Sequence, residues 1–211
     1  MLTKNTIRTI VYLTIFSVAM GYMESAVVVY LRLIFYPEGF AFPLKAIDQH
    51  TAVVEILREA ATLIMLAGAG IISGRTRTEK FGLFLFCFAV WDIFYYVFLK
   101  LLIGWPESLL TWDILFLIPV TWVGPVIAPV INSITMIVLA VMISYFTDKN
   151  LSILIKKPEW LLLILGSLVT IISYTYDYMN FMLSRFNLTD FFDPSMQSEL
   201  LENATGYLPQ E

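Results

Sequence analysis

The sequence predicts an all-α integral membrane protein, a bundle of five transmembrane helices. The composition is the first reason, because 59% of the 211 residues are hydrophobic and only 14% are charged, whereas soluble domains average about 25% charged residues. The second reason is that five stretches reach the roughly 20 mostly apolar residues that a helix needs to cross a bilayer. The third is that Lys and Arg gather in alternate connections between these stretches, as the positive-inside rule requires.

The expected spans follow one another with short connections. Basic residues, Lys4 and Arg8, lie near the start of the first span, as they do in a signal peptide. The apolar stretch is longer than the apolar part of a signal peptide, and no small-residue cleavage site follows it. We therefore expect a retained helix. The segment 108–120, SLLTWDILFLIPV, is too short to span, and we expect it to lie on the membrane surface or to re-enter it. The five spans cover about 7–33, 51–73, 81–103, 124–147 and 159–183.

Basic residues set the expected orientation. With five crossings, three basic groups fall on one side, which predicts a cytoplasmic N-terminus and an external C-terminus in the plasma or inner membrane. Residues 1–183 then form a single transmembrane domain, and 184–211 form an acidic tail outside the cell. The basic groups are Lys4 and Arg8; Arg75, Arg77 and Lys80; and Lys149, Lys156 and Lys157.

Several functional classes are excluded by residue counts. The single histidine, His50, rules out bis-histidine haem ligation, so no haem is expected. The single cysteine, Cys87, rules out a disulfide framework and a multi-cysteine metal site. A net charge of −4 provides no basic surface for nucleic acid.

Ionisable residues inside the apolar stretches are the most informative feature. A charge at the bilayer centre costs about 2.5–3.5 kcal/mol on insertion scales, so these side chains are expected to face the bundle interior and one another. With the orientation above, they fall mostly in the outer half of the membrane. Glu55, Arg58 and Glu59 share one helical face, and Asp92 and Tyr96 are stacked one turn apart.

These residues lead to a first functional hypothesis, a membrane-embedded enzyme acting on a lipid-like, quinone-like or otherwise amphiphilic substrate in the outer half of the bilayer. Buried carboxyl groups can serve as acid and base or can bind a divalent cation through their oxygens. The expected catalytic residues are Glu24, Glu59, Asp92 and Asp113. The expected substrate-binding residues are Arg58, Trp91, Tyr96, Asn132 and Asp177. The candidate metal ligands are Glu24, Glu55, Glu59 and Asp92.

Two other hypotheses stay open. A proton- or cation-coupled transporter, or an ion-binding membrane protein, would also use deep carboxyl groups. An accessory subunit of a membrane complex would use them as structural ion pairs. In that structural interpretation Glu55, Arg58 and Glu59 form an ion-pair knot, while Arg32 and Lys100 extend to the interface. The expected partners are the lipid bilayer, a lipid or quinone-like ligand, and a second copy or another subunit of a membrane complex.

Overall fold

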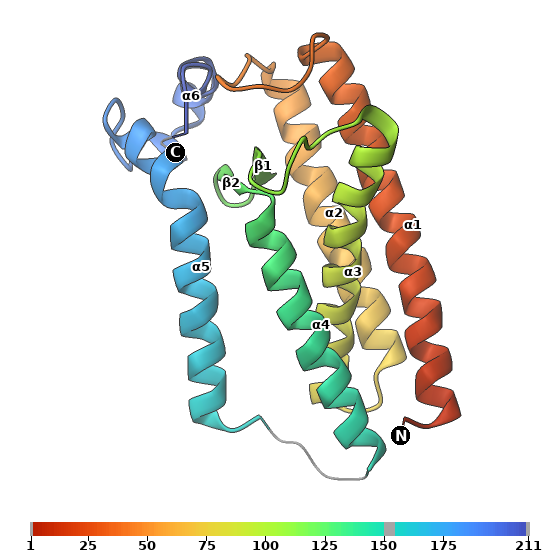
Figure 1. Ribbon diagram of the computed structural model, residues 1–211. Helices are drawn as coiled ribbons and strands as arrows, with labels where there is room; N and C mark the ends of the chain where they lie inside the picture. The colour runs from red at the N-terminus through yellow and green to blue at the C-terminus, as the bar shows by residue number, and fades with distance from the viewer. Residues whose placement is uncertain (1, 150–154, 210–211) are drawn as a thin grey trace.

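Five long helices dominate the computed structural model, which describes residues 2–149 and 155–209 (Figure 1). Each is long and apolar enough to cross a membrane, and this confirms the expected all-α architecture and the five apolar helices. The N-terminus lies at one end of the bundle and the C-terminal segment at the other. Residues 210–211 of the expected tail lie outside the described residues. The helices are α1 (Lys4–Phe35), α2 (Gln49–Ser73), α3 (Arg77–Ile103), α4 (Ile127–Asp148) and α5 (Lys157–Leu183).

Local signals fix where the first three helices begin. The side chains of Thr3, Asp48 and Thr76 each accept a hydrogen bond from a backbone N–H of the following first turn, which satisfies donors that a helix start leaves free. The hydrogen bonds from Thr51 also hold the pKa of the exposed Asp48 below its ordinary value. At the other end of α3, Gly104 adopts φ 71°, a left-handed conformation that suits glycine after a helix.

Helix α3 is the centre of the bundle and packs against α1, α2 and α4. Glycines allow the close approach: an added Cβ at Gly70 of α2 would lie 2.5 Å from the backbone nitrogen of Phe84, and one at Gly21 of α1 would lie 3.0 Å from the carbonyl oxygen of Trp91. Small residues let helix backbones meet in this way. Near the N-terminal end of the bundle the resulting core is apolar, and it includes Leu13, Leu66, Leu83, Phe86 and Cys87.

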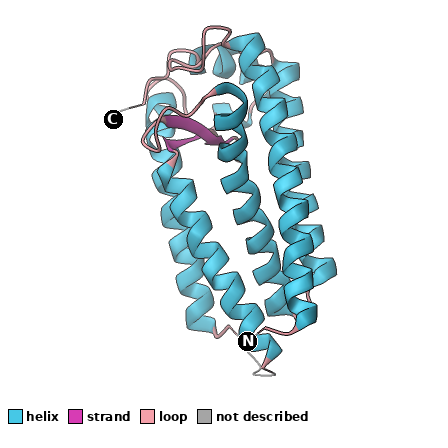
Figure 2. Cartoon of the chain, turned by 45° about the vertical axis from the view of Figure 1, so that its right-hand side comes forward, coloured by secondary structure: helices cyan, strands magenta, loops and turns pink. Residues whose placement is uncertain are grey.

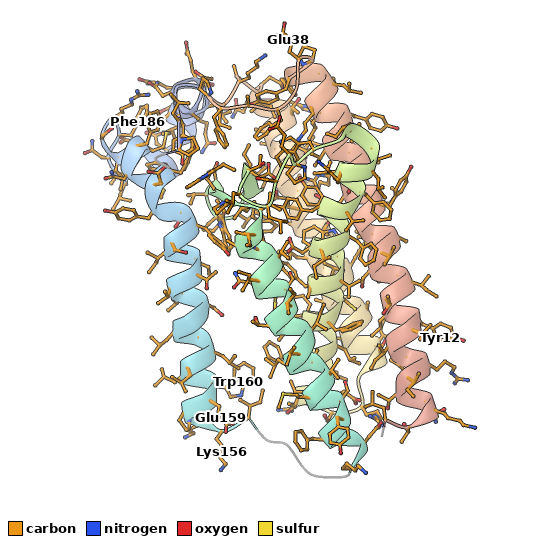
Figure 3. The ribbon with its side chains drawn as sticks, in the orientation of Figure 1. Tyr12, Glu38, Lys156, Glu159, Trp160 and Phe186 are labelled. Atoms are coloured by element: carbon orange, nitrogen blue, oxygen red, sulfur yellow. The ribbon has the colours of Figure 1, made fainter. Side chains whose placement is uncertain are left out.

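Helix α5 stands apart from the other four (Figure 1). No residue in its most apolar stretch is buried. It packs on the rest of the chain chiefly at the end away from the N-terminus, through the strand described next. At its other end, where Figure 3 shows Lys156, Glu159 and Trp160, the Trp160 ring lies 5.1 Å from that of Phe81 on α3.

A short hairpin occupies the place where a surface or re-entrant segment was expected. Strands β1 (Trp112–Phe116) and β2 (Trp122–Pro125) pair antiparallel, with Asp113 opposite Gly124. Figure 2 shows the pair between the helices at the end remote from the N-terminus. Strand pairing satisfies backbone groups that a helix does not cover. Since Gly124 and Pro125 belong to β2, α4 begins at residue 127 and not at the expected 124.

The C-terminal segment folds back over this same end. It contains α6 (Gln197–Ala204) and then Tyr207, which is fully buried against the rings of Phe42, Tyr178 and Phe181. The Tyr207 hydroxyl donates to Asp177 at 2.5 Å. Burial, followed by this hydrogen bond, raises the pKa of Tyr207, so it acts as a neutral donor. The tail therefore joins α5 to the loop after α1.

Candidate functional site

A cavity of about 280 Å³ lies at the end of the bundle remote from the N-terminus, between α1, α2, α3, the hairpin and α6. Most of its wall is apolar, which suits a hydrocarbon chain. Charged side chains from several elements interrupt that wall. The apolar lining includes Val28, Leu31, Phe35, Ile56, Leu115 and Phe116. The charged lining residues are Glu24, Arg32, Lys45, Glu55, Arg58, Glu59, Asp92 and Asp113.

Arg58 joins two of these carboxylates. Its Nη1 donates to Oε1 of Glu24 on α1, and its Nε donates to Oε2 of Glu55 at 2.8 Å. Thr62, one turn further along α2, donates to the second oxygen of Glu24 at 3.3 Å. The spacing of three residues within α2 places Glu55 beside Arg58, while packing of α1 supplies Glu24. This triad is a charge-assisted hydrogen-bond network with one net negative charge.

Arg32 and Asp113 form a second ion pair, between α1 and β1. The Nη2 of Arg32 lies 3.0 Å from Oδ1 of Asp113, and the guanidinium carbon lies 3.6 Å from the ring centroid of Trp105 and 4.5 Å from that of Phe40. Arg32 is only 7% exposed. The expectation that it extends to the interface is therefore wrong, because the hairpin brings it a buried carboxylate and the loops bring it aromatic faces.

Glu59 and Asp92 differ from the other acids of the cavity. Oε2 of Glu59 accepts a hydrogen bond from the backbone N–H of Leu117 in the hairpin at 2.9 Å. Oδ2 of Asp92 accepts one from the hydroxyl of Ser133 on α4 at 2.8 Å. Within the described part of the chain neither carboxyl forms an ion pair. Neutral hydrogen-bond donors therefore hold these two carboxyl groups, and no described arginine or lysine forms an ion pair with either.

The structure brings most of the predicted site residues to this one cavity. Seven line it: Glu24, Glu55, Arg58, Glu59, Trp91, Asp92 and Asp113.

Three predicted substrate-binding residues are not among the described residues that line the cavity. Tyr96 is buried next to Leu99 and Val126. Asn132 donates to the hydroxyl of Tyr174 at 2.6 Å and so connects α4 to α5. Asp177 accepts from Tyr207. These contacts give all three a structural place outside the cavity wall.

A metal centre finds little support in this arrangement. Across residues 2–149 and 155–209, no three His, Cys, Asp or Glu side chains are grouped so that they could hold a metal ion. The guanidinium of Arg58 is bonded to both Glu24 and Glu55, so it already compensates two of the four proposed ligands. The predicted set of Glu24, Glu55, Glu59 and Asp92 lines one cavity without forming a ligand cluster.

Sequence reasoning missed Arg32 and Lys45 as members of the site. Periodicity could have found the first of these, since Glu24, Val28 and Arg32 follow each other at four-residue intervals and all three line the cavity. Lys45, by contrast, lies in the loop after α1, with its Nζ 5.4 Å from the ring centroid of Tyr36. No periodic pattern places a loop residue.

Comparisons with protein-family models, with curated proteins and with solved structures found no match to this chain. Its function is therefore inferred from the chemistry of the cavity. A carboxyl group without a partner cation can take up or release a proton. An apolar wall beside such a group can hold the hydrocarbon part of an amphiphile.

Proposed function

We propose that this protein is an integral membrane enzyme that binds a lipid-like or amphiphilic substrate in the outer half of the bilayer and performs acid–base chemistry at its polar head. One observation carries the proposal: Glu59 and Asp92, two carboxyl groups without an ion-pair partner in the described chain, line the same mostly apolar cavity. A purely structural use of buried acids would favour pairing each with a cation.

The surface of the helices supports a membrane location. Large apolar side chains are exposed along the helices, far beyond the scattered examples on a soluble protein. Lipid tails would cover them. Prominent examples are Ile64, Ile72, Leu101, Leu162 and Val169.

The orientation follows from the distribution of charge. The N-terminus, the α2–α3 connection and the start of α5 lie at the same end of the bundle (Figure 1), and the basic residues of the connections gather there. The positive-inside rule assigns this end to the cytoplasm. The cavity, at the opposite end, then opens its polar chemistry within the outer half of the bilayer.

The lining residues suggest distinct roles. Glu59 and Asp92 exchange protons with the substrate head, and a positioned acid or base contributes about 10²–10⁴ in rate. Arg58 holds Glu24 and Glu55 in place at the cavity wall. The apolar wall from α1, α2 and the hairpin holds the hydrocarbon chain.

Transport is less well supported than catalysis. Between the cavity and the N-terminal end of the bundle, the packed core contains buried apolar side chains such as Leu66, Leu83 and Phe86. A coupled transporter needs polar groups or a rearranging break in its helices along the whole path. The described residues of this core offer neither a charged nor a broken segment.

The test is conversion of lipid by the purified protein in nanodiscs. A total membrane-lipid extract is incubated with it, and mass spectrometry follows which species disappear and which appear. We expect one lipid class to be converted by the native chain and conversion to fall by about 10² or more in Asp92→Asn and Glu59→Gln, the range for loss of an acid or base.

Glu202→Gln provides the matched control, because Glu202 is exposed on α6 and is not among the lining residues. It should convert lipid at the native rate. Conversion that survives both Asp92→Asn and Glu59→Gln, or a native protein that converts no class, would reject the proposed enzyme.

A further inference from the structure

The charge of the cavity is unbalanced. Among the described lining residues there are five carboxylates, against the cations Arg32, Lys45 and Arg58. Lys45 is exposed in a loop, so the buried and half-buried part of the wall contains five acids and two guanidinium groups. An uncompensated charge in an apolar membrane environment costs several kcal/mol, and a bound molecule is one way to remove that cost.

Both buried cations are already committed. Arg58 bonds to Glu24 and Glu55, and Arg32 bonds to Asp113 and lies over the Trp105 ring. Each guanidinium is thus bonded to at least one carboxylate, and among the described residues Nη1 of Arg32 has no hydrogen-bond partner. One negative charge of the excess therefore belongs to the Arg58 triad, and the rest belongs to Glu59 and Asp92, whose hydrogen-bond donors are an amide and a hydroxyl.

Aromatic side chains line the same cavity as these two acids. Trp91 precedes Asp92 on α3, and Tyr95 and Phe116 also line the cavity. Aromatic faces beside carboxylates are a common environment for bound ammonium groups, because the ring quadrupole attracts a cation. The Nε1–H of the buried Trp91 has no hydrogen-bond partner among the described residues, so an oxygen next to a ligand ammonium group would find a donor there.

We propose that the substrate head group is cationic, an amine or ammonium group that lies between Glu59 and Asp92 while the hydrocarbon chain follows the apolar wall. This inference rests on the proposed function, because it names the substrate class of the same cavity. An anionic head would add to the excess negative charge. A neutral hydroxyl would leave that excess in place.

Three probes with the same alkyl chain separate these cases: dodecylamine, dodecanol and dodecanoate. Each is titrated into the protein in nanodiscs made of a zwitterionic lipid, which has no net charge. Native mass spectrometry then measures the saturable number of probe molecules bound per protein chain. We expect dodecylamine to bind at least about tenfold more tightly than the other two, the ratio that corresponds to about 1.4 kcal/mol. Asp92→Asn and Glu59→Gln should each remove most of this preference and leave dodecanol binding unchanged.

The control again is Glu202→Gln, which removes one negative charge at the same end of the molecule but outside the cavity. It should retain the full preference for the amine, which excludes a general effect of net charge. Equal saturable binding of all three probes, or tightest binding of dodecanoate, would overturn the cationic head group but leave an amphiphile-binding enzyme in place. Amine binding that is unchanged in both cavity variants would also overturn it, since the amine would then bind without help from either acid. Failure of all three probes to bind saturably would overturn this inference and the proposed function together.

Discussion

At the scale of single residues, the acids of the cavity divide into those with a cation and those without one. Glu24, Glu55 and Asp113 are paired with an arginine, whereas Glu59 and Asp92 accept hydrogen bonds only from neutral donors in the described chain. The two classes respond to mutation in opposite ways. Removing one member of a buried pair strands the other charge, whereas neutralising an unpaired acid removes an unfavourable charge.

Arg58→Met tests the paired class. The substitution leaves Glu24 and Glu55 without their cation, so we expect the free energy of unfolding to fall by about 3–5 kcal/mol. Thermal unfolding in detergent measures this loss. Adding Glu24→Gln to Arg58→Met should restore part of it, because one stranded charge is removed. Lys157→Met, at an exposed position, should change stability by no more than about 0.5 kcal/mol. A mild effect of Arg58→Met would show that the triad contributes little to the fold.

Asp92→Asn tests the unpaired class. The amide oxygen can still accept the hydrogen bond from Ser133, and no cation is stranded. We therefore expect an unchanged or higher melting temperature together with loss of the preference for the amine, the pattern of a functional group kept at some cost to stability. A protein that melts much earlier and keeps all its ligand would return Asp92 to a structural role.

At the scale of elements, the sequence predicts helices better than it predicts strands. The five apolar stretches are long enough to leave few alternatives, and caps such as Thr76 and Gly104 mark their ends. The hairpin is different, because β1 has five residues and turns the charged Asp113 inward. A strand usually buries apolar residues, so a buried aspartate is the reverse of the usual pattern. Burial of Asp113 becomes favourable only when Arg32 of α1 forms an ion pair with it. A sequence pattern does not contain this partner.

The same distinction applies to the site. Glu55, Arg58 and Glu59 share a face by helical periodicity alone, and this was foreseen. The contact of Arg58 with Glu24 depends on how α1 and α2 are placed around α3, and the hydrogen bond from Leu117 to Glu59 depends on the hairpin. Contacts between elements are set by tertiary packing, which a single sequence does not reveal.

Helix packing gives a matched prediction from two glycines of α2. A Cβ at Gly70 would lie 2.5 Å from the Phe84 nitrogen and 2.7 Å from its Cα, whereas a Cβ at Gly68 would meet nothing within 4 Å. Gly70→Ala must therefore separate α2 from α3, and overpacking of this kind costs typically about 1–3 kcal/mol. Gly68→Ala should be neutral or stabilising by up to about 1 kcal/mol, since alanine favours the helix. Melting temperatures of the two variants measure the difference, and equal values would contradict the close approach.

At the scale of the whole molecule, the two ends of the bundle perform different tasks. At the N-terminal end, Asp148 accepts hydrogen bonds from the Thr3 backbone, the Thr6 hydroxyl and Arg75, and Arg75 also bonds to Glu79. This network ties α1, α3 and α4 together. At the other end, the loops, the hairpin and the tail lie around the mostly apolar cavity and its charged side chains. Ion pairs and hydrogen bonds thus join the helices at the N-terminal end, and the cavity lies at the opposite end.

Five crossings would place these two ends on opposite sides of the membrane, and this gives the last prediction. In truncated fusions, a reporter attached after Arg77, between α2 and α3, should be active only in the cytoplasm. A reporter attached after Glu211 should be active only outside, because α3, α4 and α5 are three further candidate spans. Each fusion is tested with two reporters, one that is active only in the cytoplasm and one that is active only outside the cell.

The weak packing of α5 makes this test demanding. If α5 lay along the membrane surface instead of crossing it, the chain would cross four times and both fusions would report the cytoplasm. That result would also remove the cavity from the outer half of the bilayer, since Tyr178 of α5 is part of its wall. Opposite locations for the two reporters, in contrast, fix α5 as a span. They then place Glu59 and Asp92 on the external side, where an amphiphile from the outer leaflet can reach them.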